Sequence, residues 1–157
     1  MRFSVNTQSF YDDEYEKNAI VVDLPSDIEV INDEQYARFF NAINSTQVVY
    51  RVAGEYTISQ PRPDKYHSWD VTSNTWVITD AALAQKSADE IADAELRRSA
   101  LLSAAGAVIS PLQDAVDLGV ATDAEMGQLT EWKKYRVLLM RISTSKAPDI
   151  EWPTPPA

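Results

Sequence analysis

Hydrophobic and polar residues follow two different patterns along the chain, and the change comes near Asp80. Before this point, short runs rich in Val, Tyr, Trp and Thr alternate with turn residues, a pattern typical of β-strands. After it, the sequence becomes rich in Ala, Leu and Glu, which favour helices. The pattern predicts an α+β fold, with a small β-rich N-terminal domain at residues 1–79. A helical C-terminal domain at residues 80–157 would hold a long helix, a helical hairpin and a proline-rich tail.

The first sixty residues predict strands and one helix. The strands are expected at residues 20–23, 46–53 and 56–59. The last two would form a hairpin that turns at Gly54. Asn32 and Gln35 fit a capping box, in which each residue bonds to the backbone of the other, and predict a helix through about Asn41. Apolar residues at helical spacing would cover the sheet, namely Tyr36, Phe39, Phe40 and Ile43.

A second hairpin is expected from Trp69 to Val77, where two indole rings flank a polar turn. Pro61 and Pro63 lack the amide donor of a strand ladder, so a loop should precede this hairpin. The aromatic rings here have two interpretations: they form the core of a small sheet, or they bind sugar rings. The glycan platform would consist of Trp69, Trp76, Tyr66 and Tyr56, with Asn74 and Asp70 supplying hydrogen bonds.

Three helices are expected in the C-terminal domain. The first would run over residues 81–105 and end at Gly106, and its Ala-rich face indicates packing against another helix or another copy of the chain. Ser110 as the N-cap and Pro111 at the first helical position predict the start of a second helix. Gly119 would end this helix.

The third helix should open at a capping box formed by Thr122 and Glu125 and continue to about Ser143, as the second arm of a helical hairpin. Its apolar positions recur every three or four residues, which indicates a core-facing stripe. The stripe comprises Leu129, Trp132, Tyr135 or Arg136, Leu139 and Ile142, with Leu138 beside it.

The last residues, 147–157, are rich in proline, which imposes an extended path. Such tails are usually disordered, yet Ile150 and Trp152 would expose apolar surface to solvent. Disorder and docking onto the helices or a partner therefore remain alternatives.

The formal net charge of −10 makes nucleic acid an unfavourable partner. The first eighty residues carry −7 and the rest −3, with a locally basic segment at residues 133–146. No secretory signal or membrane-spanning segment is expected in the sequence, which predicts a cytoplasmic protein.

Few residues could support chemistry. The sequence has no cysteine and one histidine, His67, so a thiolate site or a histidine cluster cannot form. The acidic run at residues 12–16 lacks the spacing of a calcium loop, and four glycines cannot build a phosphate-binding loop. No pair is singled out among the 24 acidic residues for glycoside hydrolysis. We expect no catalytic residue, cofactor or metal site.

Three C-terminal segments closely resemble the tail-fibre assembly proteins of lambda-like and Mu-like phages and prophages. These segments are SPLQDAVDL at 110–118, WKKYRVLL at 132–139 and APDIEWP at 147–153, and the order and spacing also match. Trp69 to Val77 resembles a further pattern of the family, Trp, six residues, then Trp-Val. Met140, where many relatives have Asn, departs from the pattern, as does Ile142-Ser143 in place of Val-Asp.

The resemblance implies a non-enzymatic chaperone that helps three fibre chains fold and trimerise in the host bacterial cytoplasm by binding the C-terminal region of the fibre. In some relatives the protein stays on the fibre tip and contributes to receptor contact, which would add a host surface glycan as a second ligand. We also expect a homo-oligomer. The partner-binding residues would be Trp132, Lys133, Lys134, Tyr135, Arg136, Asp149, Ile150 and Trp152.

Overall fold

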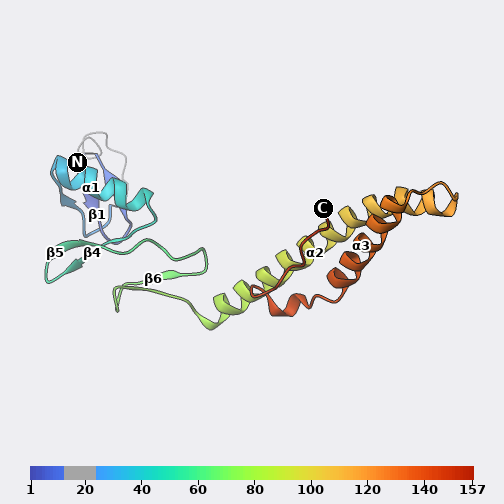
Figure 1. Cartoon of the computed structure of the whole chain (residues 1–157). Helices are drawn as coiled ribbons and strands as arrows, with labels where there is room; N and C mark the ends of the chain where they lie inside the picture. Colours follow the sequence, from blue (N-terminus) through green and yellow to red (C-terminus); the bar gives the residue numbers. More distant parts are fainter. Residues whose placement is uncertain (13–23) are drawn as a thin grey trace. The chain divides into compact units, whose positions relative to one another are not determined.

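The computed structural model describes residues 1–12 and 24–157 (Figure 1). It confirms the predicted α+β class, since short strands precede two long helices. The chain divides into two compact units, Met1–Ala82 and Leu83–Ala157. The strand predicted at residues 20–23 lies outside the described residues, as does nearly all of the acidic run at 12–16.

The N-terminal unit begins with a three-stranded antiparallel sheet that the sequence did not reveal. It has the order β2-β1-β3, from β1 (Arg2–Ser4), β2 (Ser9–Tyr11) and β3 (Glu29–Val30). Strands of two or three residues are too short to show alternation, so their pairing depends on tertiary contacts. Buried Phe3 is the central side chain of this sheet and pairs with Phe10 across the ladder.

Helix α1 (Asp33–Asn44) covers the core of this unit. The predicted capping box is present, because Asn32 accepts from the amide of Gln35 and Gln35 accepts from the amide of Asn32. Phe39 is fully buried, whereas Phe40 is 47% exposed and covers the sheet only in part, through a ring contact of 6.4 Å with Phe10 of β2. Fewer residues of the helix are buried than its apolar pattern predicts.

The predicted hairpin at Gly54 is confirmed. Strands β4 (Val49–Val52) and β5 (Glu55–Ile58) pair with Val52 opposite Glu55. The two turn residues, Ala53 and Gly54, have φ angles of 52° and 89°, and such left-handed pairs match the twist of a two-residue hairpin turn. Strand β4 is shorter than predicted, since Thr46 adopts a left-handed conformation before it begins, and β5 has the predicted length but starts one residue earlier.

The second predicted hairpin is also present, as β6 (Ser68–Asp70) and β7 (Thr75–Val77). Trp69 lies directly opposite Trp76 in the register.

The second unit begins with α2 (Asp80–Asp117), a single helix where two were predicted. Gly106 does not end it, and Pro111 lies inside it. A proline within a helix removes one hydrogen bond and costs about 3 kcal/mol. Ala105 and Ile109, on either side of Gly106, are both buried, and the helix continues through Pro111 to Asp117. The prediction of a second helix starting at Ser110 is therefore wrong.

Helix α2 ends as predicted at Gly119, whose φ angle is 70°. The amide of Gly119 donates to Val116 O at 3.0 Å, and that of Val120 donates to Ala115 O at 3.0 Å. These two bonds form a Schellman motif, the turn that commonly ends a helix with glycine. The chain then enters the predicted capping box of Thr122 and Glu125.

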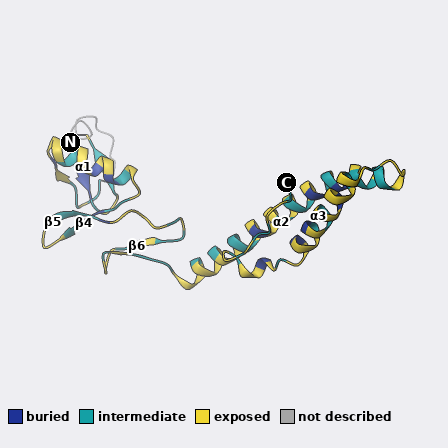
Figure 2. Ribbon diagram, in the orientation of Figure 1, coloured by how far each residue is buried: buried dark blue, intermediate teal, exposed yellow. Residues whose placement is uncertain are grey.

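Helix α3 (Asp123–Met140) returns alongside α2 (Figures 1 and 2). Its core stripe is confirmed at Leu129, Tyr135 and Leu139, so Tyr135 rather than Arg136 faces inward. The helix ends three residues earlier than expected, and a 3₁₀ turn, η2 (Thr144–Lys146), follows. Together α2 and α3 form a helical hairpin, but its first arm is the long helix α2 and not the separate short helix that the sequence predicted.

The proline-rich tail docks on the helices. Trp152 packs with Trp132 and Ile142 against the buried cluster formed by Ala105, Tyr135 and Leu139. The loop that leads into the tail is held on α2 by a hydrogen bond that Arg98 Nη1 donates to Ile142 O at 3.0 Å. Of the two alternatives, disorder and docking, the structure shows docking.

By length and composition alone, α2 could cross a membrane, since one window of 18 residues has a mean hydropathy of 1.2 and is 11% buried. This departs from the expectation that no segment is apolar enough. A single such helix is weak evidence, because the core helix of a soluble protein passes the same test of length and composition. Since α2 packs Ala105 against α3 and the tail, we treat it as a helix of the protein core.

Candidate functional site

The predicted partner-binding residues fall into two groups. The three aromatic residues, Trp132, Tyr135 and Trp152, belong to the core of the helical unit. Trp132 and Tyr135 meet edge to face with ring centroids 5.7 Å apart. Tyr135 is buried, and Trp132 and Trp152 are partly buried against the same cluster, so all three side chains contribute to the core of the unit.

The basic residues of the predicted set lie on α3 and are at least partly exposed. Lys133 donates to Gln113 Oε1 on α2, and Lys134 forms an ion pair of 2.7 Å with Glu131. Arg136 is half-buried. Lys133 and Lys134 line an open cleft of about 540 Å³ together with Thr130, Val137, Leu138 and Arg141.

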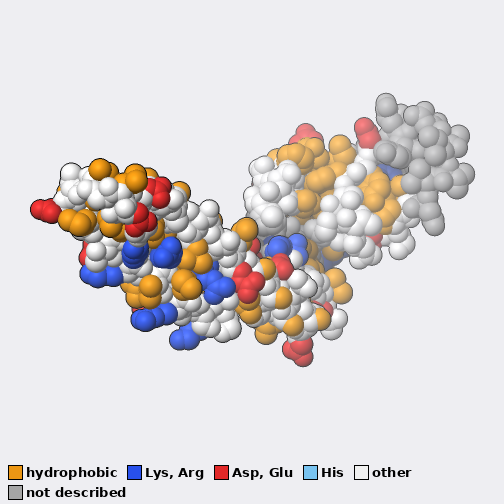
Figure 3. Space-filling model, turned by 90° about the vertical axis from the view of Figure 1, so that its right-hand side faces the viewer, with side chains coloured by type: hydrophobic (Ala, Val, Ile, Leu, Met, Phe, Trp, Pro, Cys, Tyr) orange, Lys and Arg blue, Asp and Glu red, His pale blue; other side chains and the backbone are white. Residues whose placement is uncertain are grey.

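A second cleft, of about 500 Å³, adjoins the first and brings in the tail. Leu138 and Arg141 line both clefts, and the second also contains Lys146, Asp149 and Ile150. Leu138 is 49% exposed although it is large and apolar. We call this surface, made of Thr130, Lys133, Lys134, Val137, Leu138, Arg141, Lys146, Asp149 and Ile150, the α3 face. Figure 3 shows basic and hydrophobic side chains side by side on the helical unit.

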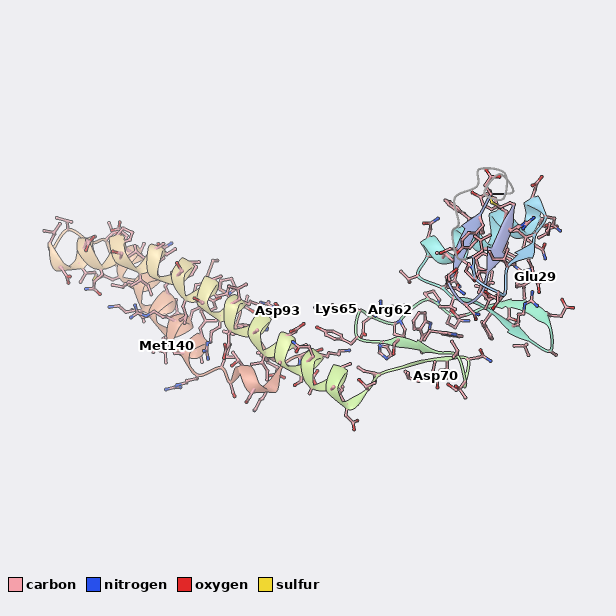
Figure 4. All side chains as sticks on the ribbon, turned by 180° about the vertical axis from the view of Figure 1, so that it is seen from behind. Glu29, Arg62, Lys65, Asp70, Asp93 and Met140 are labelled. Atoms are coloured by element: carbon pink, nitrogen blue, oxygen red, sulfur yellow. The ribbon has the colours of Figure 1, made fainter. Side chains whose placement is uncertain are left out.

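Sequence reasoning missed part of the α3 face. Five residues of the face were not proposed as partner contacts, namely Thr130, Val137, Leu138, Arg141 and Lys146. The spacing of Val137 and Arg141 to Lys134 and Leu138 is helical, so the signal was available once α3 was known to pack through its opposite side. Met140, which departs from the family pattern, is 67% exposed on the same helix, and its side chain is labelled in Figure 4.

The proposed glycan platform is only partly assembled. Trp69 and Trp76 meet at 5.3 Å in an edge-to-face arrangement, and Tyr50 packs on Trp69 at 5.1 Å. Trp76 donates from Nε1 to Gln60 O at 2.8 Å. A cleft of about 270 Å³ is lined by both indoles and Asn74.

The remaining platform residues have other roles. Tyr56 packs on buried Phe39 with ring centroids 4.9 Å apart, so it belongs to the core. Tyr66 lies outside the lining of the tryptophan cleft, with Lys65 Nζ 4.8 Å from its ring centroid. Asp70, labelled in Figure 4, accepts from the Thr72 amide and the Ser73 hydroxyl, both at 2.8 Å. These bonds hold the pKa of Asp70 below its ordinary value, and its carboxylate stabilises the turn of the hairpin.

Candidate metal ligands and the single histidine complete the set of residues considered from the sequence. Within residues 1–12 and 24–157, no group of three Asp, Glu, His or Cys side chains could hold a metal ion. His67 contacts Asp64 through Nδ1 at 2.6 Å, a local contact across three residues.

Comparison with known proteins identifies the family of the chain. The family described as Caudovirales tail fibre assembly protein, lambda gpK, matches residues 6–157. The chain belongs to this family. The tail fibre assembly protein of Escherichia phage lambda is 46% identical over 92 residues, which cover 59% of this chain and 45% of that protein. A probable tail fibre assembly protein of Shigella phage SfV is 32% identical over 154 residues, 98% of this chain and 76% of that protein.

The family predicted from the C-terminal motifs is therefore confirmed. With a probable tail fibre assembly protein of Acyrthosiphon pisum secondary endosymbiont phage 1, identity reaches 58% over 66 residues. That match covers 42% of this chain and 43% of the relative, so the chain spans less than half the length of this relative and of the lambda protein. No solved structure matches the chain.

Proposed function

We propose that the chain is a non-enzymatic chaperone that binds the C-terminal region of a phage tail fibre while three fibre chains fold and associate. Membership of the tail fibre assembly family supports a role in assembly. The α3 face is the observation that carries the binding step, since Val137 and Leu138 expose apolar surface between Lys134 and Arg141. Exposed apolar patches with polar borders commonly mark protein-binding sites.

The chemistry of the α3 face suits an incompletely folded fibre tip. Its apolar residues would cover the hydrophobic surface that fibre chains later bury against one another. Arg141 and Lys146 would attract acidic groups on the fibre, which favours correct encounters more than it adds affinity. Of the residues predicted from the sequence, we assign fibre contact to Lys133, Lys134, Asp149 and Ile150.

The two units would have different roles in assembly. We propose that residues 1–79 select a particular fibre and that residues 80–157 carry the shared folding task. Exchanging residues 1–79 for those of another family member should transfer fibre choice to the hybrid. If the hybrid still assists only its original fibre, the division is wrong.

The first experiment is co-expression with the fibre fragment encoded beside the gene, measuring soluble SDS-resistant trimer. We expect trimer only when the chain is present. Leu138→Asp should abolish this assistance because a carboxylate would occupy the centre of the α3 face. Leu118→Asp is the matched control, since Leu118 is 76% exposed in the turn between the helices, outside the clefts of the face.

Two outcomes would contradict the proposal in different ways. Equal trimer yields with and without the chain would rule out assistance in folding. Loss of trimer with both aspartate variants would mean that acidic substitution acts through general stability, and the α3 face would lose its assignment.

We also propose that the chain self-associates and works in the host bacterial cytoplasm before the fibre joins the particle. Leu83 and Leu96 are exposed on α2, and each offers apolar surface to a second copy. Light scattering of the purified chain measures its mass directly. Co-purification with finished fibres would show retention on the tip, whereas its absence would show release.

Glycan binding is a second candidate, favoured by the cleft that Trp69, Trp76 and Asn74 line. Tyr50 and Trp76 occupy contact surface of Trp69, which leaves less of that ring for a sugar. The test is binding of the chain to host surface polysaccharide, with Trp76→Ala expected to abolish it. Unchanged binding by this variant would remove the cleft from consideration.

A further inference from the structure

The outer edge of β4 is partly closed by a side chain that imitates a strand. Gln8 donates from Nε2 to Val49 O at 2.7 Å and accepts from Val49 N at Oε1 at 2.8 Å. A neighbouring strand would satisfy the same two backbone groups in the same way. Gln8 has a φ angle of 51°, which is uncommon for a residue other than glycine.

The turn that carries Gln8 is held in place independently of β4. Asp27 accepts from the Ser4 hydroxyl at 2.7 Å and from the Asn6 amide at 2.8 Å. Partial burial would raise the pKa of Asp27, but these bonds outweigh it and lower the pKa. The Gln8 amide is therefore presented to the edge by a fixed turn.

The next position along this edge is open. In the β4–β5 hairpin, Val48 bonds to Ser59 and the register places Val49 and Arg51 at alternate, outward-facing positions. Within residues 1–12 and 24–157, the backbone N–H and C=O of Arg51 have no hydrogen-bond partner. The Arg51 side chain is engaged elsewhere, with Glu29 and with the Tyr56 hydroxyl.

A cleft of about 470 Å³ runs along this open edge. Val5, Asn6 and Gln8 line it from the β1–β2 turn, and Trp69, Val71 and Asn74 line it from the second hairpin. Val71 is 78% exposed and offers an apolar contact at the wall of the cleft. The cleft thus combines an unpaired strand edge with aromatic, aliphatic and amide side chains.

We propose that this cleft binds an extended segment of the fibre chain, which adds as a strand to the edge of β4 at Arg51. Strand addition supplies backbone hydrogen bonds to the edge, while side-chain contacts decide which segment fits. The bound segment exchanges two hydrogen bonds with Arg51 and places an apolar side chain against Trp69 and Val71. The added strand would end before Val49, because the Gln8 side chain already bonds to the backbone N–H and C=O of Val49. This inference rests on the proposed function, because it takes the fibre as the partner.

The side-chain contact is tested with two valine variants in the full-length chain. Val71→Asp should weaken binding of the fibre fragment by roughly ten-fold or more, as measured by calorimetry. Val30→Asp is the matched control, because Val30 is 75% exposed in β3 and does not line the cleft. Equal affinities for the two variants and the native chain would overturn the proposal.

The backbone contact is tested at Arg51. Arg51→Pro removes the outward amide, and proline is tolerated on an edge strand when its missing N–H faces solvent. Arg51→Ala removes the same side chain but keeps the backbone N–H. We therefore expect Arg51→Pro to bind the fibre fragment with an affinity several-fold lower than that of Arg51→Ala. In the native chain, hydrogen exchange at the Arg51 amide should slow on adding the fibre fragment. An unchanged exchange rate would overturn strand addition, whatever the affinity.

The outcomes separate this inference from the proposed function. If Val71→Asp and Arg51→Pro bind the fragment normally while trimer formation still requires the chain, the chaperone role stands and the strand site is wrong. If Val71→Asp lowers binding of host polysaccharide and leaves fibre binding unchanged, the cleft is a sugar site and the inference is also wrong. Failure of the chain to bind any fibre fragment would count against both.

Discussion

Arg97 places its guanidinium carbon 4.5 Å from the centre of the Trp152 ring, which ties the proline-rich tail to helix α2. A cation over an indole face adds roughly 0.5–1 kcal/mol at an exposed site. The ring also packs against Trp132 and Ile142 in the core of the helical unit. The tail is thus a structural part of this unit.

Replacing Trp152 with Ala should therefore destabilise the helical unit. We expect the free energy of unfolding to fall by about 2–3 kcal/mol, from lost apolar burial and the lost cation contact. Urea unfolding followed by circular dichroism at the helical band measures this change. Glu151→Ala, at an exposed neighbouring position, should leave the value within about 0.5 kcal/mol. Similar stability of the two variants would mean that the tail does not stay docked in solution.

Two glycines of the helical hairpin should respond in opposite directions to alanine. Gly119→Ala should destabilise by about 1 kcal/mol, because a side chain disfavours the left-handed conformation at φ 70°. Gly127→Ala should stabilise by about 0.5–1 kcal/mol, since Gly127 lies within α3 with open space around it. Thermal unfolding of both variants checks the pair, and a gain in stability for Gly119→Ala would contradict the Schellman turn.

Pro111→Ala tests whether α2 is continuous. Alanine restores the amide that a helix would bond to Ala107 O, so the free energy of unfolding should rise by about 1–3 kcal/mol. Pro111 itself is exposed, so its removal leaves no cavity. If a separate helix began at Ser110, the substitution would remove a favourable first-turn proline and slightly lower stability. Denaturant unfolding distinguishes the two signs.

The N-terminal unit should lose stability in acid through Glu29. A hydrogen bond from Arg51, assisted by the Tyr56 hydroxyl, holds the pKa of Glu29 below its ordinary value. Because the folded pKa is the lower one, the contribution is fully present above the unfolded pKa. It is lost as pH falls through the folded pKa. Calorimetric unfolding from neutral pH to about pH 3 should show the Tm difference between the native chain and Glu29→Gln shrinking toward zero. A constant difference would show that the contact does not depend on the charge of Glu29.

The sequence predicted elements whose signals are local. The capping boxes at Asn32 and Thr122, and the glycine turns at Gly54 and Gly119, all formed as expected. Each depends on hydrogen bonds or φ angles within a few residues, so neighbouring sequence contains the information. The C-terminal motifs likewise predicted the family, because each motif is a contiguous run of residues.

Predictions failed where packing overrides a local preference. Pro111 carries the local signal for a helix start, yet one helix runs through it, with Ile109 buried before it and Gln113 bonded to Lys133 of α3 after it. The sheet of β1, β2 and β3 went unpredicted because each strand is too short to show a pattern. The predicted contact set also mixed core with surface, because sequence does not show which side of α3 meets α2.

The sequence by itself determined the α+β class, the first residues of α1 and α3 at their caps, the two hairpin turns and the family. The tertiary structure alone decided that the aromatic residues of the C-terminal motif are core, that Leu138 and Arg141 are surface, and that the tail docks. It also decided that Gln8 meets Val49 across 41 positions of sequence. The physical reason is that caps and turns are satisfied within one or two turns of chain, whereas burial and edge pairing depend on which distant segments meet.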